Sequence, residues 1–170
     1  GIRGEDLGKI ALVANNIRQG SIVGFDASEG VAIGQRMADN LGLALGDSIT
    51  LVSPDGDVTP FGTTPRVKAY PVAAIFEIGM SEYDSSILFM PLAEAQRYFS
   101  KPKSVSVLEV VLDSPDDVSK IGPKITEAGG SSTYISDWRQ RNATFFTALQ
   151  VERNVMFLIL SLIVLVASLN

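Results

Sequence analysis

The sequence contains no cysteine and no histidine. The chain therefore cannot form a disulfide, a thiolate nucleophile or a Cys/His zinc site, and acid–base mechanisms that rely on imidazole are excluded. An enzyme built on this chain would have only Ser, Lys, Tyr, Asp and Glu for its chemistry. The net charge is −5 and no basic run interrupts the sequence, so a cationic face for nucleic acid is not expected.

Motifs for nucleotides and metal ions are also missing. Gly56 and Gly62 are separated by five residues and followed by Thr63, whereas a phosphate-binding loop has four residues between its glycines and then Lys. Asp55-Gly56-Asp57 lacks the spacing and the distal Glu of a calcium loop. Asp113, Asp116 and Asp117 could attract a cation, but Ser114-Pro115 followed by two acids is typical of a helix start, which explains these residues better. We therefore predict no cofactor and no metal.

No catalytic constellation stands out among the remaining residue types. A Ser/Lys nucleophile pair needs a desolvated lysine, but Lys101 and Lys103 belong to a polar Lys-Pro-Lys turn. Glu77, Glu82 and Asp84 have no spacing that demands an acid–base pair. The sequence predicts a non-catalytic chain, with a membrane-anchored Ser/Lys hydrolase as the enzyme alternative.

A long apolar run ends the sequence. Val155–Leu169 contains no charged residue and only two serines. A membrane-spanning helix needs about 20 apolar residues, and a core helix without a polar face would be unusual in a domain of this size. We interpret the run as the start of a transmembrane segment and the preceding residues as an extramembrane domain; a buried C-terminal helix is the other interpretation.

The rest of the chain alternates helical and strand patterns, which predicts an α+β fold with a β-rich middle. Asp137 and Gln140 have the spacing of a helix cap and its partner. The expected helices are 7–19, 30–41, 91–99 and one beginning at Ser114 and ending at Gly129-Gly130, and the expected strands are 21–25, 47–52, 67–78, 86–90, 105–112 and 132–136.

One loop-like stretch carries an unexpected aromatic residue. Ser53 to Lys68 reads SPDGDVTPFGTTPRVK, in which turn-forming residues surround Phe61. Strand patterns on either side predict a hairpin, and a hairpin can hold an aromatic tip away from the core. Phe61 is therefore a candidate contact for a partner.

Three blocks of sequence resemble the LolC/LolE permeases, the membrane subunits of the bacterial lipoprotein-releasing ABC transporter. They are LGLALGDSITLVSP, TPFGTTPRVKAYPVAAIFEIGMSEYDSSILFMPLAEAQRYF and ISDWRQRNATFFTALQVERNVMFLILSLIVLVASLN. The layout is more distantly similar to the periplasmic core of MacB-type permeases. The resemblance implies an α/β porter-like subdomain over 1–46 and 105–138 and a β-rich sabre-like insertion over 47–104. A hook loop would occupy 53–68, and a connecting helix with the start of a transmembrane segment would occupy 139–170.

The resemblance also implies a function. The domain would face the periplasm from the inner membrane and recruit a LolA-type lipoprotein carrier through the hook, while a separate cytoplasmic subunit hydrolyses ATP. A second permease subunit and lipoprotein cargo would be the other partners. The implied carrier contacts are Thr59, Pro60, Phe61, Gly62, Pro65, Arg66 and Lys68. Phe145, Phe146 and Met156 are candidates for the lipid-facing side of the membrane helix.

Other assignments stay open at this point. The sequence does not separate LolC-type, LolE-type and hybrid subunits, which resemble one another. A MacB-type or FtsX-type permease domain that contacts a different partner is the main alternative, and an anchored structural module without a specific partner is another.

Overall fold

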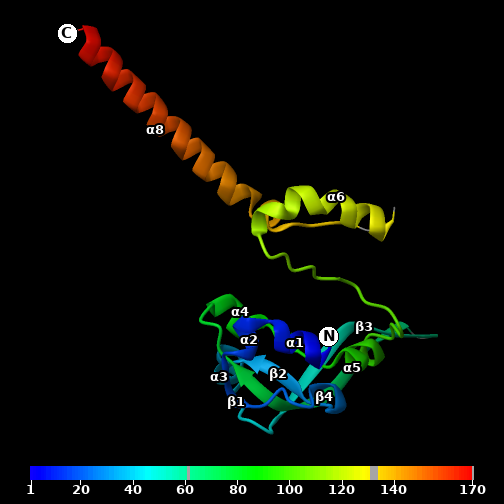
Figure 1. The fold of residues 1–170 in the computed structure, drawn as a ribbon. Coiled ribbons are helices and arrows are strands. Elements are labelled where there is room, and N and C mark those ends of the chain that lie inside the picture. Colours follow the sequence, from blue (N-terminus) through cyan, green and yellow to red (C-terminus); the bar gives the residue numbers. More distant parts are fainter. Residues whose placement is uncertain (61, 131–133, 170) are drawn as a thin grey trace. The chain divides into compact units, whose positions relative to one another are not determined.

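The computed structural model describes residues 1–60, 62–130 and 134–169, and these divide into two compact units. The first unit is Gly1–Leu108, and the second begins at Glu109. Phe61 lies outside the described residues, and so do two residues of the strand expected at 132–136. Figure 1 colours the chain from its first residue to its last.

The first unit combines short helices with a mixed β-sheet. Its elements, in chain order, are α1 Gly4–Lys9, α2 Ala11–Ala14, β1 Ile17–Gly20, η1 Phe25–Ala27, β2 Val31–Gly34, α3 Gln35–Leu41, β3 Ser48–Thr59, β4 Gly62–Phe76, α4 Ser81–Ser86, β5 Leu88–Phe89 and α5 Leu92–Tyr98. The α+β prediction is thus confirmed.

Strand β4 pairs with three other strands, β1, β2 and β3, and β5 joins the sheet through β2. Its first ten residues pair with β3 as an antiparallel hairpin, from Thr59 opposite Gly62 to Ser48 opposite Pro71. Its last residues lie between β1, which is antiparallel, and β2, which is parallel. The order β1-β4-β2-β5 completes the sheet. Pro71, which predicted an edge or a bulge, lies where pairing passes from β3 to β2 and next to a register shift in the β2 ladder.

Both faces of the sheet are covered. One cluster of buried side chains joins β2 and β4 to α3 and α5, and includes Ile33, Tyr70 and Tyr98. The opposite cluster joins the same strands to α1 and α2 and includes Leu7 and Phe76. Each of these large apolar side chains contributes about 1.5–3 kcal/mol when fully buried, so the sheet is the core of the unit.

The first expected helix is correct only in part, and the strand expected after it is wrong. The predicted helix over Leu7–Gln19 breaks at Ile10, and its last part is strand β1, in which Ile17 lies opposite Phe76. Pairing with β4 therefore outweighs the local helical periodicity. The strand expected at Ser21–Phe25 is absent from this described stretch, because Gly24 has φ 73° there and starts the 3-10 turn η1.

Three further elements were predicted incorrectly in part or in full. The helix over Gly30–Leu41 is correct only from Gln35 onward, and Gly42 ends it with φ 65° as expected. Its first part is β2, whose four residues are all buried. Val105–Leu112 is described but forms no strand, and residues 134–136 are irregular.

The second unit is helical in its described residues. Its elements are η2 Pro115–Asp117, α6 Val118–Gly129, α7 Trp138–Arg141 and α8 Ala143–Leu169. The helix start at Ser114-Pro115 is confirmed, and so is the cap of α7, where the Gln140 N–H donates to the Asp137 carboxylate at 2.8 Å. The predicted division into porter-like and sabre-like subdomains stays a prediction.

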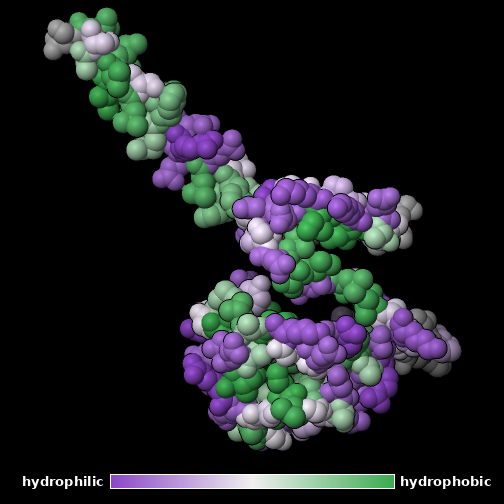
Figure 2. All heavy atoms as spheres, in the orientation of Figure 1, coloured by the Kyte–Doolittle hydropathy of each residue, from purple (hydrophilic) through white to green (hydrophobic). Residues whose placement is uncertain are grey.

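Helix α8 is long and apolar enough to cross a membrane. Figure 2 shows hydrophobic residues over its C-terminal half. None of its described residues is buried against the rest of the chain, which favours the transmembrane interpretation over a buried core helix.

Candidate functional site

The segment predicted as a loop is mostly a β-ladder. Strands β3 and β4 pair up to Thr59 and Gly62, which leaves a connection of two residues. Short connections of this kind hold the register of a hairpin tightly. In Figure 1 the hairpin extends beyond the body of the first unit. Thr59, Pro60 and Gly62 are thus at or beside the tip, whereas Phe61 is outside the described residues.

A bulge divides this hairpin into two ladders. The register shifts between Ser53, which lies opposite Arg66, and Asp57, which lies opposite Thr64. Within the bulge, a Cβ atom on Gly56 would overlap the Thr64 carbonyl. The close approach of the two backbones therefore requires glycine here. Pro65, one of the predicted contacts, is on the strand opposite this bulge.

The two faces of the hairpin differ in exposure. On the inner face, Ile49 and Ser53 are buried, and Tyr70 is 0% exposed. On the outer face, Val52 and Val67 lie directly opposite each other and are each 63% exposed. Because alternate residues of a strand point to opposite faces, the outer face presents an apolar pair to solvent.

A buried carboxylate fixes the base of the hairpin to α5. The Glu94 side chain is only 2% exposed, and its Oε1 accepts from Lys68 Nζ at 2.6 Å and from Tyr70 Oη at 3.0 Å. Arg97 forms an ion pair with the other oxygen. Burial alone would raise the pKa of Glu94, but the bonds from Lys68 and Tyr70 and the nearby cations outweigh it and lower the pKa.

A second attachment lies two pairs further along the ladder. Arg66 donates to the Tyr98 carbonyl at 2.7 Å, and the Tyr98 hydroxyl donates to the Arg66 carbonyl at 3.3 Å. Arg66 and Lys68, predicted as carrier contacts, are thus both bonded to α5 in this structure. Glu94 was missed by sequence reasoning, because it reads as an ordinary acid in the first turn of a helix.

These attachments predict that stability falls at both ends of the pH range. The lowered Glu94 pKa stabilises the fold above its ordinary value of 4.5, and this stability is lost as the pH falls through the folded-state pKa. Burial and the bond to Glu94 raise the pKa of Tyr70 above 10.0, so unfolding becomes easier once the pH exceeds that value. Thermal denaturation from acid to alkaline pH measures the loss of stability at each end of the pH range, here called the acid limb and the alkaline limb.

Two variants test which residue is responsible for each limb of the stability curve. We expect Glu94→Gln to flatten the acid limb and Tyr70→Phe to flatten the alkaline limb, each with lower stability at neutral pH. Unchanged limbs in both variants would mean that other groups control the pH dependence.

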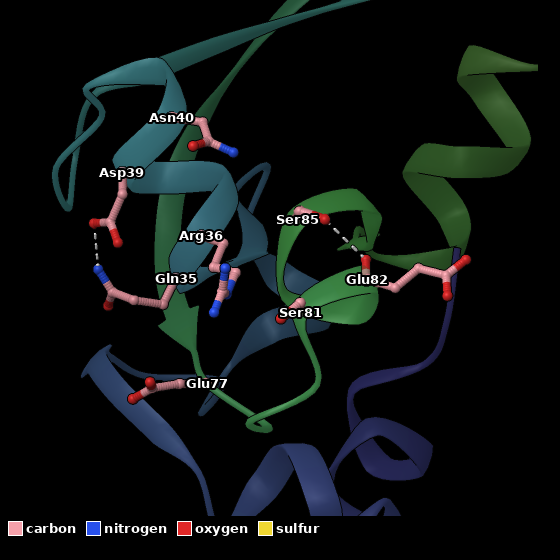
Figure 3. A pocket seen from close by; sticks show the side chains of 8 residues that line it. All are labelled: Gln35, Arg36, Asp39, Asn40, Glu77, Ser81, Glu82 and Ser85. Carbon is pink, nitrogen blue, oxygen red and sulfur yellow. Dashed lines mark hydrogen bonds between the residues drawn. The ribbon is translucent and has the colours of Figure 1, made fainter.

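A polar pocket lies between α3 and α4. It has a volume of about 630 Å³ and is lined by Gln35, Arg36, Asp39, Asn40, Glu77, Ser81, Glu82 and Ser85. Figure 3 shows Gln35 bonded to Asp39 and the Ser85 hydroxyl directed to the Glu82 carbonyl. Among the described lining residues Arg36 is the one cation, and Glu77 is paired with Arg18 at 2.9 Å. Because no lysine is among these described lining residues, the pocket gives the Ser/Lys hydrolase alternative no support.

Asp84 fastens the segment that joins β4 to α4. Its carboxylate is buried and accepts from the backbone N–H groups of Ile78 at 2.8 Å and Gly79 at 3.0 Å. The Asp84 backbone in turn packs against Gly34 at the end of β2, where a Cβ atom would overlap the Asp84 carbonyl. Asp84 therefore has a structural role, and the sequence spacing with Glu77 and Glu82 marks no acid–base pair.

The sequence matches a known protein family. The model of the MacB-like periplasmic core domain matches residues 8–128, which covers most of the chain. The chain belongs to this family. The MacB-like domain is periplasmic, and the apolar α8 that follows it fits anchoring in the inner membrane.

Curated relatives of the MacB-like domain are lipoprotein-releasing system transmembrane proteins. LolC of Neisseria meningitidis is 31% identical over 82% of this chain and 34% of its own length. LolC of Xylella fastidiosa is 27% identical over 95% of the chain and 39% of its own length. LolE of Haemophilus influenzae is 23% identical over the same shares. The resemblance to LolC/LolE permeases is confirmed, and the chain spans little more than a third of these relatives.

The residues predicted to face lipid lie on α8, two of them in its first turn. Phe146 stacks on Trp138 with ring centroids 5.5 Å apart, and Phe145 contacts Phe146 at 6.0 Å. Met156, further along, is 54% exposed. The Trp138 indole N–H also donates to the Pro115 carbonyl, so the aromatic cluster connects the start of α8 to η2, the turn that precedes α6. Contact of these side chains with lipid stays a prediction.

Proposed function

We propose that this domain recruits a LolA-type periplasmic lipoprotein carrier through the β3–β4 hairpin, as part of a LolC-type or LolE-type permease. Three features of the hairpin support the proposal. Its short tip extends beyond the unit (Figure 1), and its outer face presents apolar side chains to solvent. Its base is bonded to α5. Because the base of the hairpin is bonded to α5, less conformational entropy of the hairpin base is lost when a partner binds.

The proposal places no chemistry on this chain. ATP would be hydrolysed by cytoplasmic partner subunits, a second permease subunit would complete the membrane part, and the cargo would be lipoproteins destined for the outer membrane. The hairpin would bring the carrier to the cargo. The names of the relatives, all components of a lipoprotein-releasing system, support this assignment.

The family match by itself also fits a MacB-type or FtsX-type permease domain with another partner. A binding measurement separates the two. The full-length permease, in nanodiscs, is titrated with a purified LolA-type carrier and, separately, with a periplasmic efflux adaptor and a regulator of cell-wall hydrolases. Saturable binding of the carrier alone is expected; binding of either other partner in its place would overturn the proposal.

A further inference from the structure

A free cation lines the polar pocket between α3 and α4. Arg36 is exposed, and it has no ion pair or side-chain hydrogen bond with any described residue. Two carboxylates of the same pocket already have other partners: Asp39 accepts from Gln35 at 2.7 Å. Glu77 is paired with Arg18. Arg36 therefore lies in a concave site without a counter-ion from the described part of the chain.

The walls of this pocket are held in place by contacts behind it. Gln35 and Glu77, which line it, directly follow Gly34 and Phe76, the last residues of the parallel strands β2 and β4. Asp84 packs its backbone against Gly34, and its carboxylate accepts from two backbone N–H groups between β4 and α4. In open α/β sheets, ligands bind in the crevice beyond the carboxyl ends of parallel strands. The position of the pocket and its fixed walls favour a ligand site over an incidental hollow.

The lining residues favour a carboxylate as the group that Arg36 would bind. Figure 3 shows Arg36 on α3 and the serines Ser81 and Ser85 on α4, on facing sides of the pocket. A guanidinium group pairs in a bidentate manner with carboxylate or phosphate. The Ser81 hydroxyl has no bond to a described residue and can donate to the same anion. Since three carboxylates and one arginine line the pocket, a doubly charged phosphate would be repelled more than a carboxylate.

The rest of the lining favours a peptide as the molecule that carries this carboxylate. The Asn40 side chain is exposed and unbonded among the described residues, and an amide can both donate to and accept from a peptide group. Glu82 is exposed without an ion pair to a described residue, so it can bind an amine. The volume of about 630 Å³ suits a ligand larger than a single ion. None of the described lining residues is aromatic, so a sugar ring would have no apolar surface to pack on.

We propose that the pocket between α3 and α4 binds a short peptide segment in which an acidic residue lies beside a basic one. Arg36 and Ser81 would hold the carboxylate, Glu82 would pair with the amine, and Asn40 would bond to the peptide backbone. The pocket shares no lining residue with the hairpin. This site therefore goes beyond the proposed function and does not depend on it.

The test is a titration of the full-length permease, in nanodiscs, with the probe acetyl-Ser-Asp-Lys-Ser-amide, followed by saturation-transfer difference NMR. We expect saturable binding. Arg36→Gln should weaken binding at least about tenfold, because a hydrogen bond between charged groups is lost. Arg36→Lys keeps the charge but not the planar fork and should weaken binding less. A probe with asparagine in place of aspartate tests the same contact on the unaltered protein and should also bind at least about tenfold more weakly.

Two variants serve as controls for charge and for specificity. Arg3→Gln removes the same charge from an exposed ion pair on the first unit, outside the pocket, and should bind the probe like the wild type. Glu82→Gln should weaken binding of the probe about threefold, as expected for an exposed ion pair. It should leave unchanged the binding of a probe with glutamine in place of lysine.

Several outcomes would overturn the proposal. The pocket is not a peptide site if the probe shows no saturable binding, or if Arg36→Gln and the asparagine probe both keep the wild-type affinity. Displacement of the probe by an equal concentration of inorganic phosphate would identify a general anion site instead, and displacement by maltose would identify a sugar site. Circular dichroism checks that each variant is folded. Carrier binding, measured on the same samples, should be unchanged by Arg36→Gln, which keeps this result separate from the test of the hairpin.

Discussion

Replacing Phe61 with aspartate is expected to abolish carrier binding and to leave the melting temperature unchanged. A phenylalanine buried at an interface contributes about 1.5–3 kcal/mol, and a carboxylate in the same apolar site would be desolvated without a partner. Since each 1.4 kcal/mol is a factor of about ten, binding should weaken more than about a hundredfold. Titration of the permease with the purified carrier measures this loss.

Two controls give the result its meaning. Phe61→Leu keeps an apolar side chain and should weaken binding only about tenfold. Val67→Asp places the same carboxylate on the outer face of the hairpin, near its base, and reports whether any negative charge on the hairpin repels the carrier. Normal binding by Phe61→Asp would contradict the role of the tip, and so would a variant that binds poorly because it is unfolded.

Glycine-to-alanine substitutions at positions 34 and 8 are expected to change stability in opposite directions. A Cβ atom at Gly34 would overlap the backbone of Asp84, which cannot easily move because its carboxylate is bonded to two backbone N–H groups. Overpacking of this kind costs about 2–3 kcal/mol, which corresponds to roughly 10–20 °C in melting temperature for a unit of this size.

Gly8 is the matched control. It lies within α1 with no atom near the position of a new Cβ, so Gly8→Ala should stabilise the unit by about 0.5–1 kcal/mol. Thermal denaturation of both variants tests the pair. A Gly34→Ala protein that melts with the wild type would show that α4 can move away from β2.

The sequence predicts some elements well because their signals are local. The cap Asp137 and the glycine that ends α3 follow from residues within a few positions of one another. The hairpin was predicted only in part, because strands were expected at 47–52 and 67–78, whereas the ladder continues to Thr59 and Gly62. The sequence predicts a helix start where β2 lies, because four consecutive apolar residues show no periodicity that distinguishes a buried strand from a buried helix. Strand β1 depends on a partner almost 60 residues away.

The candidate site divides in the same way. A hairpin with Thr59-Pro60-Phe61-Gly62 at its tip could be predicted, since turn residues mark it. Its attachment to α5 could not, because Glu94 and Lys68 are 26 positions apart and meet only when the sheet is formed.

The continuity of β4 has a mechanical consequence. A strand of 15 residues is about 50 Å long, and this one runs from the tip of the hairpin into the middle of the sheet. A force that pulls the tip along the direction of β4 would act on several hydrogen bonds to β1 and β2 at the same time, and it would act on them in shear. The hairpin and the sheet should therefore move together as a stiff lever, and a carrier held at the tip would swing whenever the base of the domain is tilted.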